Sequence, residues 1–162
     1  MLSSFRRRSE LEVSESRKIA PALTNLAFHH FGLAVASPDD AFRYLASLGY
    51  TAGNSAFDPL QRVNLAMRHH PTMPDIEVIW PGDGPSPIDM LIKKTGTMIY
   101  HLCYTCSDAD AALAALSAAG MEILTVSPPT PAILFGGQDV SFHHISGFGL
   151  IEILHTGSRL EQ

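Results

Sequence analysis

Beyond its N-terminal segment, the chain alternates between short apolar, strand-like runs and two longer stretches with a helical pattern. The first helical stretch, SPDDAFRYLASLG, is predicted to be capped by Ser37, to carry Pro38 at its first helical position and to end at Gly49. The second, SDADAALAALSAAG, is predicted to be capped by Ser107 and to end at Gly120. Each predicted helix directly follows a predicted strand.

The two helical stretches belong to an internal repeat. An offset of 71 residues pairs His30 with His101, Asp39 with Asp110, Ala41 with Ala112, Leu45 with Leu116 and Gly49 with Gly120. Three strand-like runs follow each helix, over 50–57, 61–68 and 76–80 in the first half and over 121–126, 140–144 and 150–155 in the second. Each half therefore has the pattern of a strand, a helix and three further strands.

A single βαβββ unit cannot bury both faces of its sheet, so the repeat predicts an α+β fold in which two tandem βαβββ modules form a curved, partly closed mixed sheet around a cleft. We expect the first module over 25–81 and the second over 97–157. Between them, residues 82–96 form a connector rich in Pro and Gly with a short helical centre. Residues 1–24 are expected to be a flexible or helical extension, and 158–162 a tail.

Composition and charge narrow the class of function. With 162 residues, 46% of them hydrophobic, the chain can form a core without a disulfide or a structural metal, so a metal site would serve chemistry. The formal net charge of -5 argues against nucleic acid as the partner. No apolar run approaches the roughly eighteen residues of a membrane span. We therefore expect a small-molecule substrate and neither a nucleic acid nor a membrane partner.

Cys103 and Cys106 have the C-x-x-C spacing of a redox or metal motif, but the string YHLCYTCS that holds them reads as a strand. Residues three apart on a strand point to opposite faces, so the pair cannot readily form a disulfide or bind one metal. We expect two free thiols, which favours a reducing cytoplasm.

Two histidines and two glutamates occupy equivalent places in the repeat. His30 and His101 lie in the first strand of each half, and Glu77 and Glu152 lie in the last. Taken singly, each is better explained as a hydrogen-bonded histidine or a salt-bridged glutamate. Both glutamates are flanked by branched apolar residues, however, and an unpaired buried carboxylate is costly. The joint symmetry therefore favours one divalent metal ion bound by all four residues in the cleft.

Several segments resemble the vicinal oxygen chelate superfamily, and most closely its methylmalonyl-CoA epimerase branch, with glyoxalase I as a relative. The segments are HHFGLAVASPDDAFRYLASLG, YHLCYTCSDADAALAALSAAG, FGLIEIL, SPIDMLIKKTGTMIYHLCY and PAILFGGQDVSFHH, and the similarity covers about residues 27–155. The resemblance implies His30, Glu77, His101 and Glu152 as ligands of a divalent metal, commonly cobalt, nickel, manganese or zinc. It also implies an acyl-CoA or carrier-bound acyl substrate and a homodimer.

The sequence departs from the epimerases at one position. Epimerization needs a base on each face of the acidic carbon, and the resemblance implies Glu152 as one of them. In the epimerases the other base is a Glu in the third strand of the first module, a few residues after a Gln. Aligning that Gln with Gln61 places Leu65 where the second base should be, with Asn64 beside it, and neither can take up a proton. Glu77 stands where the epimerases can have Gln, which gives the His-Glu-His-Glu ligand set of glyoxalase I.

These features predict an isomerase or epimerase type of enzyme that removes a proton next to a carbonyl, on a small acyl or 2-oxo substrate. Glu152 is the expected base, and Glu77 is a ligand or a second base. The alternatives are a glyoxalase-like lyase and a non-catalytic protein of the same fold that binds a small molecule such as an antibiotic. A ring-cleaving dioxygenase normally uses two His and one carboxylate on iron, so Glu77 argues against it.

Four further residues are candidates for substrate binding. Asn64 would bind a substrate oxygen if it faces inward, and His144 lies on a strand expected near the substrate. Gly136 and Gly137 follow a Pro-rich run and are expected to form a mobile flap over the cleft.

The histidine doublet in FHHFGLAV can be resolved by alternation. Only one of two neighbouring strand residues should face the cleft, and the offset of the repeat selects His30. Gly32 and Ala34 are expected on the same face, where their small size would leave room for substrate. His29 is expected to point the other way, so that its replacement would cost little activity.

Overall fold

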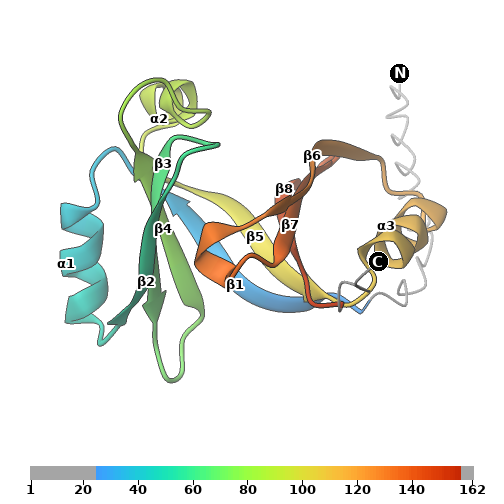
Figure 1. The fold of residues 1–162 in the computed structure, drawn as a ribbon, viewed down its shortest axis with the longest axis horizontal. Helices are drawn as coiled ribbons and strands as arrows, with labels where there is room; N and C mark the ends of the chain where they lie inside the picture. The colour runs from blue at the N-terminus through green and yellow to red at the C-terminus, as the bar shows by residue number, and fades with distance from the viewer. Residues whose placement is uncertain (1–24, 158–162) are drawn as a thin grey trace, which may run out of the picture.

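A computed structural model describes residues 25–157, so the predicted N-terminal extension and C-terminal tail lie outside the described residues. Within 25–157 the elements follow the predicted order (Figure 1). They are β1 (Ala27–Ala34), α1 (Asp39–Ser47), β2 (Thr51–Asp58), β3 (Val63–His69), β4 (Asp75–Pro81), α2 (Asp89–Thr95), β5 (Met98–Cys106), α3 (Ala109–Ala118), β6 (Ile123–Pro131), the short 3-10 helix η1 (Ile133–Phe135), β7 (Asp139–Ile145) and β8 (Gly149–His155).

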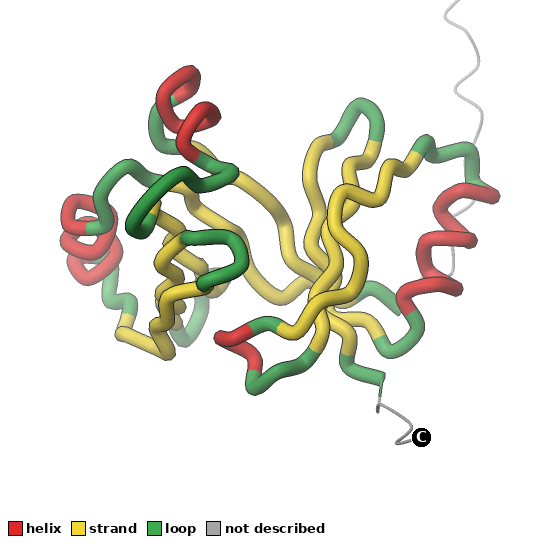
Figure 2. Tube along the Cα trace, turned by 45° about the horizontal axis from the view of Figure 1, so that its top comes forward, coloured by secondary structure: helices red, strands yellow, loops and turns green. Residues whose placement is uncertain are grey.

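The eight strands form one mixed sheet with the order β2-β3-β4-β1-β5-β8-β7-β6. In each half the first strand pairs in parallel with the last, β1 with β4 and β5 with β8, and the remaining pairs are antiparallel. The antiparallel pair of β1 and β5 joins the halves. The sheet curves between α1 and α3, which lie at opposite ends of the molecule (Figure 1 and Figure 2). The predicted α+β fold of two βαβββ modules is confirmed.

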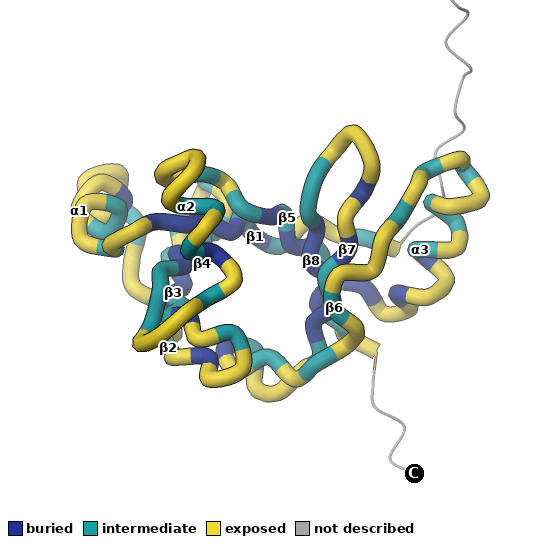
Figure 3. The backbone as a smooth tube through the Cα atoms, turned by 90° about the horizontal axis from the view of Figure 1, so that it is seen from above, coloured by how far each residue is buried: buried dark blue, intermediate teal, exposed yellow. Residues whose placement is uncertain are grey.

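Each module has its own apolar core between its helix and the convex face of the sheet. In the first, Leu45 of α1 packs with Val35 and Val78. In the second, Ala109 and Ala112 of α3 pack in a cluster that contains Cys106 and three isoleucines. Buried positions also gather on the middle strands around the concave side, whereas helices and loops are largely exposed (Figure 3). The concave side is therefore built from buried residues that these two cores do not use.

Both helix caps differ from the prediction. Pro38, and not Ser37, is at the N-cap position of α1, and no side chain caps that helix. At α3 the cap is Asp108, whose carboxylate accepts a hydrogen bond of 2.9 Å from the backbone N–H of Ala111. β5 ends at Cys106 and Ser107 lies in a bend, so the cap position falls one residue later, on a carboxylate that caps as well as a serine.

The pairing of β1 with β5 contains two irregularities. Phe28 pairs with Tyr104 and His30 with Cys103, so His29 is an extra residue without a counterpart on β5. A second shift, between Gly32 and the residue after it, leaves an extra residue on β5. A bulge of this kind interrupts the regular alternation of side chains. It falls on the histidine doublet.

Cys103 and Cys106 are both free and buried, as predicted. They lie on β5 and join separate packing clusters, Cys103 on the concave side and Cys106 beside α3. Among the described helices, none has the length and apolar character needed to cross a membrane.

Candidate metal centre

The four middle strands each contribute one side chain to a cluster on the concave side of the sheet. His30 comes from β1, Glu77 from β4, His101 from β5 and Glu152 from β8. The strand pairing brings Glu77 and His101 to the same level of the sheet, because Gly32 of β1 lies opposite both. The repeat therefore brings together the same four residues that the sequence pattern selects.

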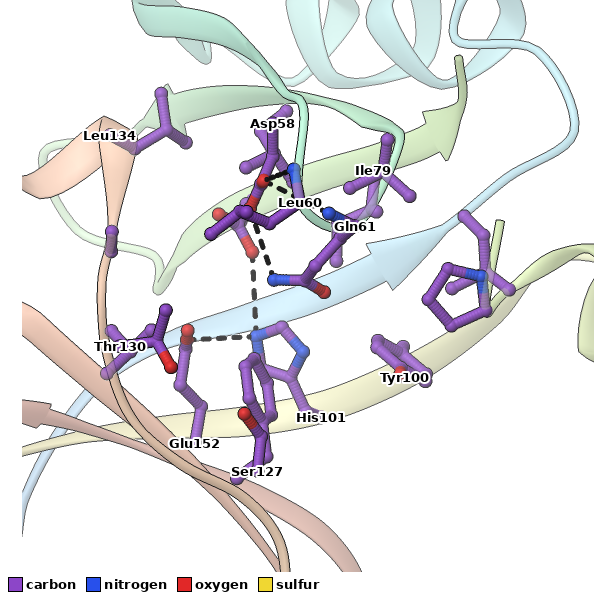
Figure 4. Close-up of a pocket in the computed structure, with 18 of the residues that line it drawn as sticks. Asp58, Leu60, Gln61, Ile79, Tyr100, His101, Ser127, Thr130, Leu134 and Glu152 are labelled. Atoms are coloured by element: carbon purple, nitrogen blue, oxygen red, sulfur yellow. Dashed lines mark hydrogen bonds and ion pairs between the residues drawn. The ribbon is translucent and has the colours of Figure 1, made fainter. Parts of the chain in front are cut away.

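The ligand atoms of these residues lie close to one another. The Nε2 atom of His101 is 3.2 Å from Oε2 of Glu152 and 3.6 Å from Oε2 of Glu77 (Figure 4). The Nε2 atom of His30 is 3.5 Å and 3.7 Å from the same two oxygens. One ligand atom from each residue lies within 4.8 Å of all the others. Each distance can therefore span a shared cation.

All four residues are buried, with exposed fractions of 0% to 4%. Several of their polar atoms have no hydrogen-bond partner among the described residues: Nε2 of His30, Nδ1 and Nε2 of His101, and Oε2 of Glu152. Unpartnered polar atoms in an interior are costly, and the convergence of the two Nε2 atoms and the Glu152 oxygen on one point calls for a bound group. Two neutral imidazoles and two carboxylates carry a charge of -2, which one divalent cation neutralises. The donor set fits a divalent metal.

The pKa values of the cluster show how its histidines and carboxylates influence one another. Burial by itself lowers the pKa of His101, but the carboxylates of Glu152 and Glu77 outweigh it and hold that pKa above its ordinary value. Burial by itself raises the pKa of Glu152, but His101 and His30 bring it below its ordinary value. The two carboxylates thus favour a positive charge at this point.

The cluster opens into a cavity of about 440 Å³ with mainly apolar walls. One wall is formed by Val63, Leu65 and Ile79, and the opposite wall includes Phe135 and Phe142. No lysine or arginine is among the described residues that line it. A ligand of this cavity therefore meets mainly apolar walls and no cationic side chain of Lys or Arg among the described lining residues.

The structure separates the two residues at the second-base position. Leu65 lines the cavity. Asn64, its neighbour on β3, does not line the cavity. Its side chain points to the other side of the sheet, where the amide donates a hydrogen bond of 3.1 Å to the carbonyl oxygen of Pro81. The expected contact of Asn64 with substrate is therefore not available in this arrangement.

The other expected substrate contacts also lie outside the cavity. His144 is exposed and borders a separate shallow depression with Glu122 and Leu124. Gly136 and Gly137 do not line the cavity but adopt positive φ angles of 63° and 81°, which end η1. Leu134 and Phe135 of η1 line the cavity in their place.

The expected outward orientation of His29 is wrong. Its Nδ1 atom lies 2.7 Å from Nδ1 of His30, and its ring packs edge-on against Phe135, a residue of the cavity wall. The bulge at His29 breaks the alternation from which the opposite orientation was predicted. Both histidines are on the concave side, with His30 nearer the carboxylates.

The expected role of Gly32 also needs correction. The space left by its missing side chain is taken by the ring of His101, and a Cβ atom at Gly32 would overlap that ring. Neither Gly32 nor Ala34 lines the cavity. Gly32 therefore makes room for the side chain of His101 and not for substrate.

Asp58 and Gln61 line the cavity and were missed by the sequence analysis as a functional pair. The Asp58 carboxylate accepts hydrogen bonds from the backbone N–H groups of Leu60 and Gln61, at 2.8 Å and 3.1 Å, and from the Gln61 side-chain amide at 3.2 Å. The Asp-Pro dipeptide after β2 is the signal that predicts such a turn. Because its amide nitrogen faces Asp58, Gln61 keeps its carbonyl oxygen as an acceptor (Figure 4).

A second group of possible ligand atoms, from His29, His30 and Cys103, shares one histidine with the first. Metal binding requires the thiolate form of cysteine. Burial, and then the charge of Glu152, raises the pKa of the Cys103 thiol, which disfavours this form. The cluster of two histidines and two glutamates is the better metal centre.

Comparison with known proteins supports this assignment of the fold. No curated protein sequence matches the chain significantly. Among solved structures, methylmalonyl-CoA epimerase from Mycobacterium tuberculosis is similar, with 25% identity, a TM-score of 0.69 and coverage of 87% of this chain and 94% of that one. A Streptomyces coelicolor methylmalonyl-CoA epimerase in complex with 2-nitronate-propionyl-CoA has 20% identity and a TM-score of 0.62, with coverage of 81% and 97%.

A methylmalonyl-CoA epimerase in complex with methylmalonyl-CoA and NH4+ has 20% identity and a TM-score of 0.63, and the match covers 85% of this chain and 98% of that one. At the level of sequence families, residues 29–142 match the Glyoxalase/Bleomycin resistance protein/Dioxygenase superfamily, which is the vicinal oxygen chelate group that the sequence resembles. This match spans most of the sheet and three of the four clustered residues. The chain belongs to the glyoxalase/bleomycin resistance protein/dioxygenase superfamily.

Proposed function

We propose that the protein is a divalent-metal-dependent enzyme that removes and returns a proton on the carbon next to a carbonyl group. The observation that carries this proposal is the buried cluster of two imidazoles and two carboxylates, whose unpartnered atoms converge at the wall of an apolar cavity. A protein that only sequesters a ligand has no evident need for two buried carboxylates.

His30, Glu77, His101 and Glu152 would hold the metal, with cobalt, nickel, manganese and zinc as candidates. When bound, such an ion acts as a Lewis acid that stabilises the negative charge developing on the substrate oxygens. The two histidines remain neutral ligands in this arrangement, and the two carboxylates balance the charge of the ion.

Glu152 is the base in this proposal. Its carboxylate lines the cavity, and a divalent cation beside it would keep it ionised and able to accept a proton from the substrate carbon. Glu77 lines the same cavity and acts as a ligand. Because Leu65 occupies the second-base position, Glu152 returns the proton on the face from which it was removed. Return to the same carbon gives hydrogen exchange with retention, and return to the neighbouring carbon of the enediolate gives an isomerisation.

The substrate is a small acyl thioester, carried by CoA or a carrier protein, or a 2-oxo compound. Three observations support this class. The apolar walls suit a hydrocarbon acyl group. The absence of lysine and arginine from the described lining leaves the metal centre to bind substrate oxygens. Structural neighbours include an epimerase in complex with methylmalonyl-CoA.

A glyoxalase-like lyase is the second candidate, and Glu77 favours it because it completes a His-Glu-His-Glu set. The two candidates share the metal and the base and differ in the substrate. A thioester is the substrate of the first, and a hemithioacetal of a 2-oxoaldehyde is the substrate of the second.

The test is deuterium exchange in D2O with the metal-loaded protein and two probes, methylmalonyl-CoA and the hemithioacetal of methylglyoxal. We expect wash-in at the carbon next to the carbonyl of one probe. Glu152→Gln should lower the rate by about 10²- to 10⁴-fold, the usual contribution of a general base. The exposed Glu122→Gln is the matched control and should exchange as the wild type does. Metal-loaded protein that exchanges neither probe would count against this function.

Two further features are proposals that belong to this function. The free cysteines on β5 are compatible with a reducing compartment, and we place the protein in the cytoplasm. We also propose a homodimer, carried over from the resemblance to the epimerases, which gel filtration with light scattering tests directly.

A further inference from the structure

His29 makes a contact that the proposed reaction does not use. Its Nδ1 atom is 2.7 Å from Nδ1 of His30, and the two rings meet edge-on at a centroid distance of 5.0 Å. Phe135 packs against both, stacked on His30 and edge-on to His29. His29 is half-buried, and the bulge in β1 places it there. The pair is therefore held by packing as well as by the short contact between nitrogens.

The number of protons between the two nitrogens follows from the distance. Two N–H groups cannot face each other at 2.7 Å, and two bare lone pairs would repel, so one proton lies between them. The other ring nitrogen of His30, Nε2, faces the carboxylates of Glu77 and Glu152. To bind a cation, that Nε2 must be unprotonated, and a neutral His30 then carries its proton on Nδ1.

We propose that His29 is a positioning residue that accepts the Nδ1 proton of His30 and so presents the Nε2 lone pair of His30 to the metal. The inference rests on the proposed metal centre. A ligand histidine commonly donates its second ring N–H to a group that fixes its tautomer and orientation. The atom of His29 that faces His30 is Nδ1, so Nδ1 is the acceptor and a neutral His29 carries its own proton on Nε2.

The two ligand histidines differ in this respect. Nδ1 of His101 is buried and has no hydrogen-bond partner among the described residues, whereas Nδ1 of His30 has His29. The ring of His101 is instead confined by the close approach of Gly32. One ligand is thus oriented by a hydrogen bond and the other by packing.

Two substitutions separate the hydrogen bond from the packing. His29→Phe keeps a ring against Phe135 and removes the acceptor, and His29→Asn places an amide oxygen where Nδ1 was. We expect the affinity for Zn²⁺, measured by competition with a chromogenic chelator, to fall by about 10- to 100-fold in His29→Phe. His29→Asn should stay within about threefold of the wild type, and so should the control His144→Phe at an exposed position. Equal affinities for His29→Phe and the wild type would overturn the inference.

A second measurement uses the wild-type protein without metal, so it depends neither on metal binding nor on the folding of a variant. In ¹⁵N-labelled wild-type protein without metal, we expect a scalar coupling across an N–H···N bond between Nδ1 of His30 and Nδ1 of His29, with the proton on His30. No coupling, or the proton on His29, would overturn the inference.

If the wild type takes up no Zn²⁺, the proposed function fails. The tautomer of His30 in metal-free His29→Phe then decides the inference, and an unchanged Nδ1–H tautomer overturns it.

Discussion

At the scale of single residues, the side chain at position 65 bears on the stereochemistry of the proposed reaction. Leu65 lines the cavity that Glu152 also lines, and it has no proton to exchange. A site with one base returns the proton to the face from which it was removed, whereas inversion needs a second base on the opposite face. With Glu77 as a ligand and Leu65 at the second-base position, the proposed reaction therefore proceeds without inversion.

Leu65→Glu should introduce inversion. We expect the metal-loaded variant to interconvert the epimers of methylmalonyl-CoA roughly tenfold or more faster than the wild type, because a carboxylate then lies in the cavity wall. Asn64→Glu is the control, since that position points to the other side of β3, and it should leave the stereochemistry unchanged. The epimer ratio over time, followed by chiral chromatography, measures this. Deuterium wash-in without inversion in Leu65→Glu would contradict the assignment of the position.

Most of the candidate site could be predicted residue by residue. The repeat and the cost of burying Glu77 and Glu152 select the cluster without knowledge of the fold. His29 could not be placed, because its orientation depends on a bulge that arises only when β1 pairs with β5. Asp58 was missed because its burial depends on how the turn after β2 folds over the cavity.

At the scale of elements, the paired strands β1 and β5 contain the two histidines of the cluster and both bulges. The strands and helices follow from apolar periodicity, with bounds that differ by a few residues from the prediction. The caps at Pro38 and Asp108 differ because an adjacent residue competes for each cap position. Pairing irregularities leave no signal in either strand alone, so the irregular pairing of β1 with β5 could not be predicted.

Gly32→Ala should displace His101. A Cβ atom there overlaps the His101 ring, and overpacking of this kind costs about 1–3 kcal/mol, so we expect the affinity for Zn²⁺ to fall roughly tenfold or more. Gly53→Ala is the matched control, because its Cβ would press mainly on the ring of the exposed His69 and then on Met67, neither of which belongs to the cluster. Competition with a chelator gives both affinities. A Gly32→Ala protein with wild-type affinity would show that His101 is not held by this contact.

At the scale of the whole molecule, the two modules place their first and last strands side by side at the centre of one sheet. Each module supplies one histidine and one glutamate, so neither module alone provides the set. The two apolar cores lie on the outer face, beside α1 and α3. The concave face holds the cluster of two histidines and two glutamates. A chain of this size can form its core without such a cluster.

The central claim is that these four residues bind one divalent metal ion. Native mass spectrometry of protein purified without chelator, and supplied with Zn²⁺ or Co²⁺, tests it most directly. We expect a mass of one chain plus one divalent ion. His30→Ala should lose the ion, and His144→Ala, which removes an exposed histidine outside the cluster, should keep it. A wild-type chain that stays metal-free in excess metal, or a His30→Ala chain that retains the ion, would contradict it.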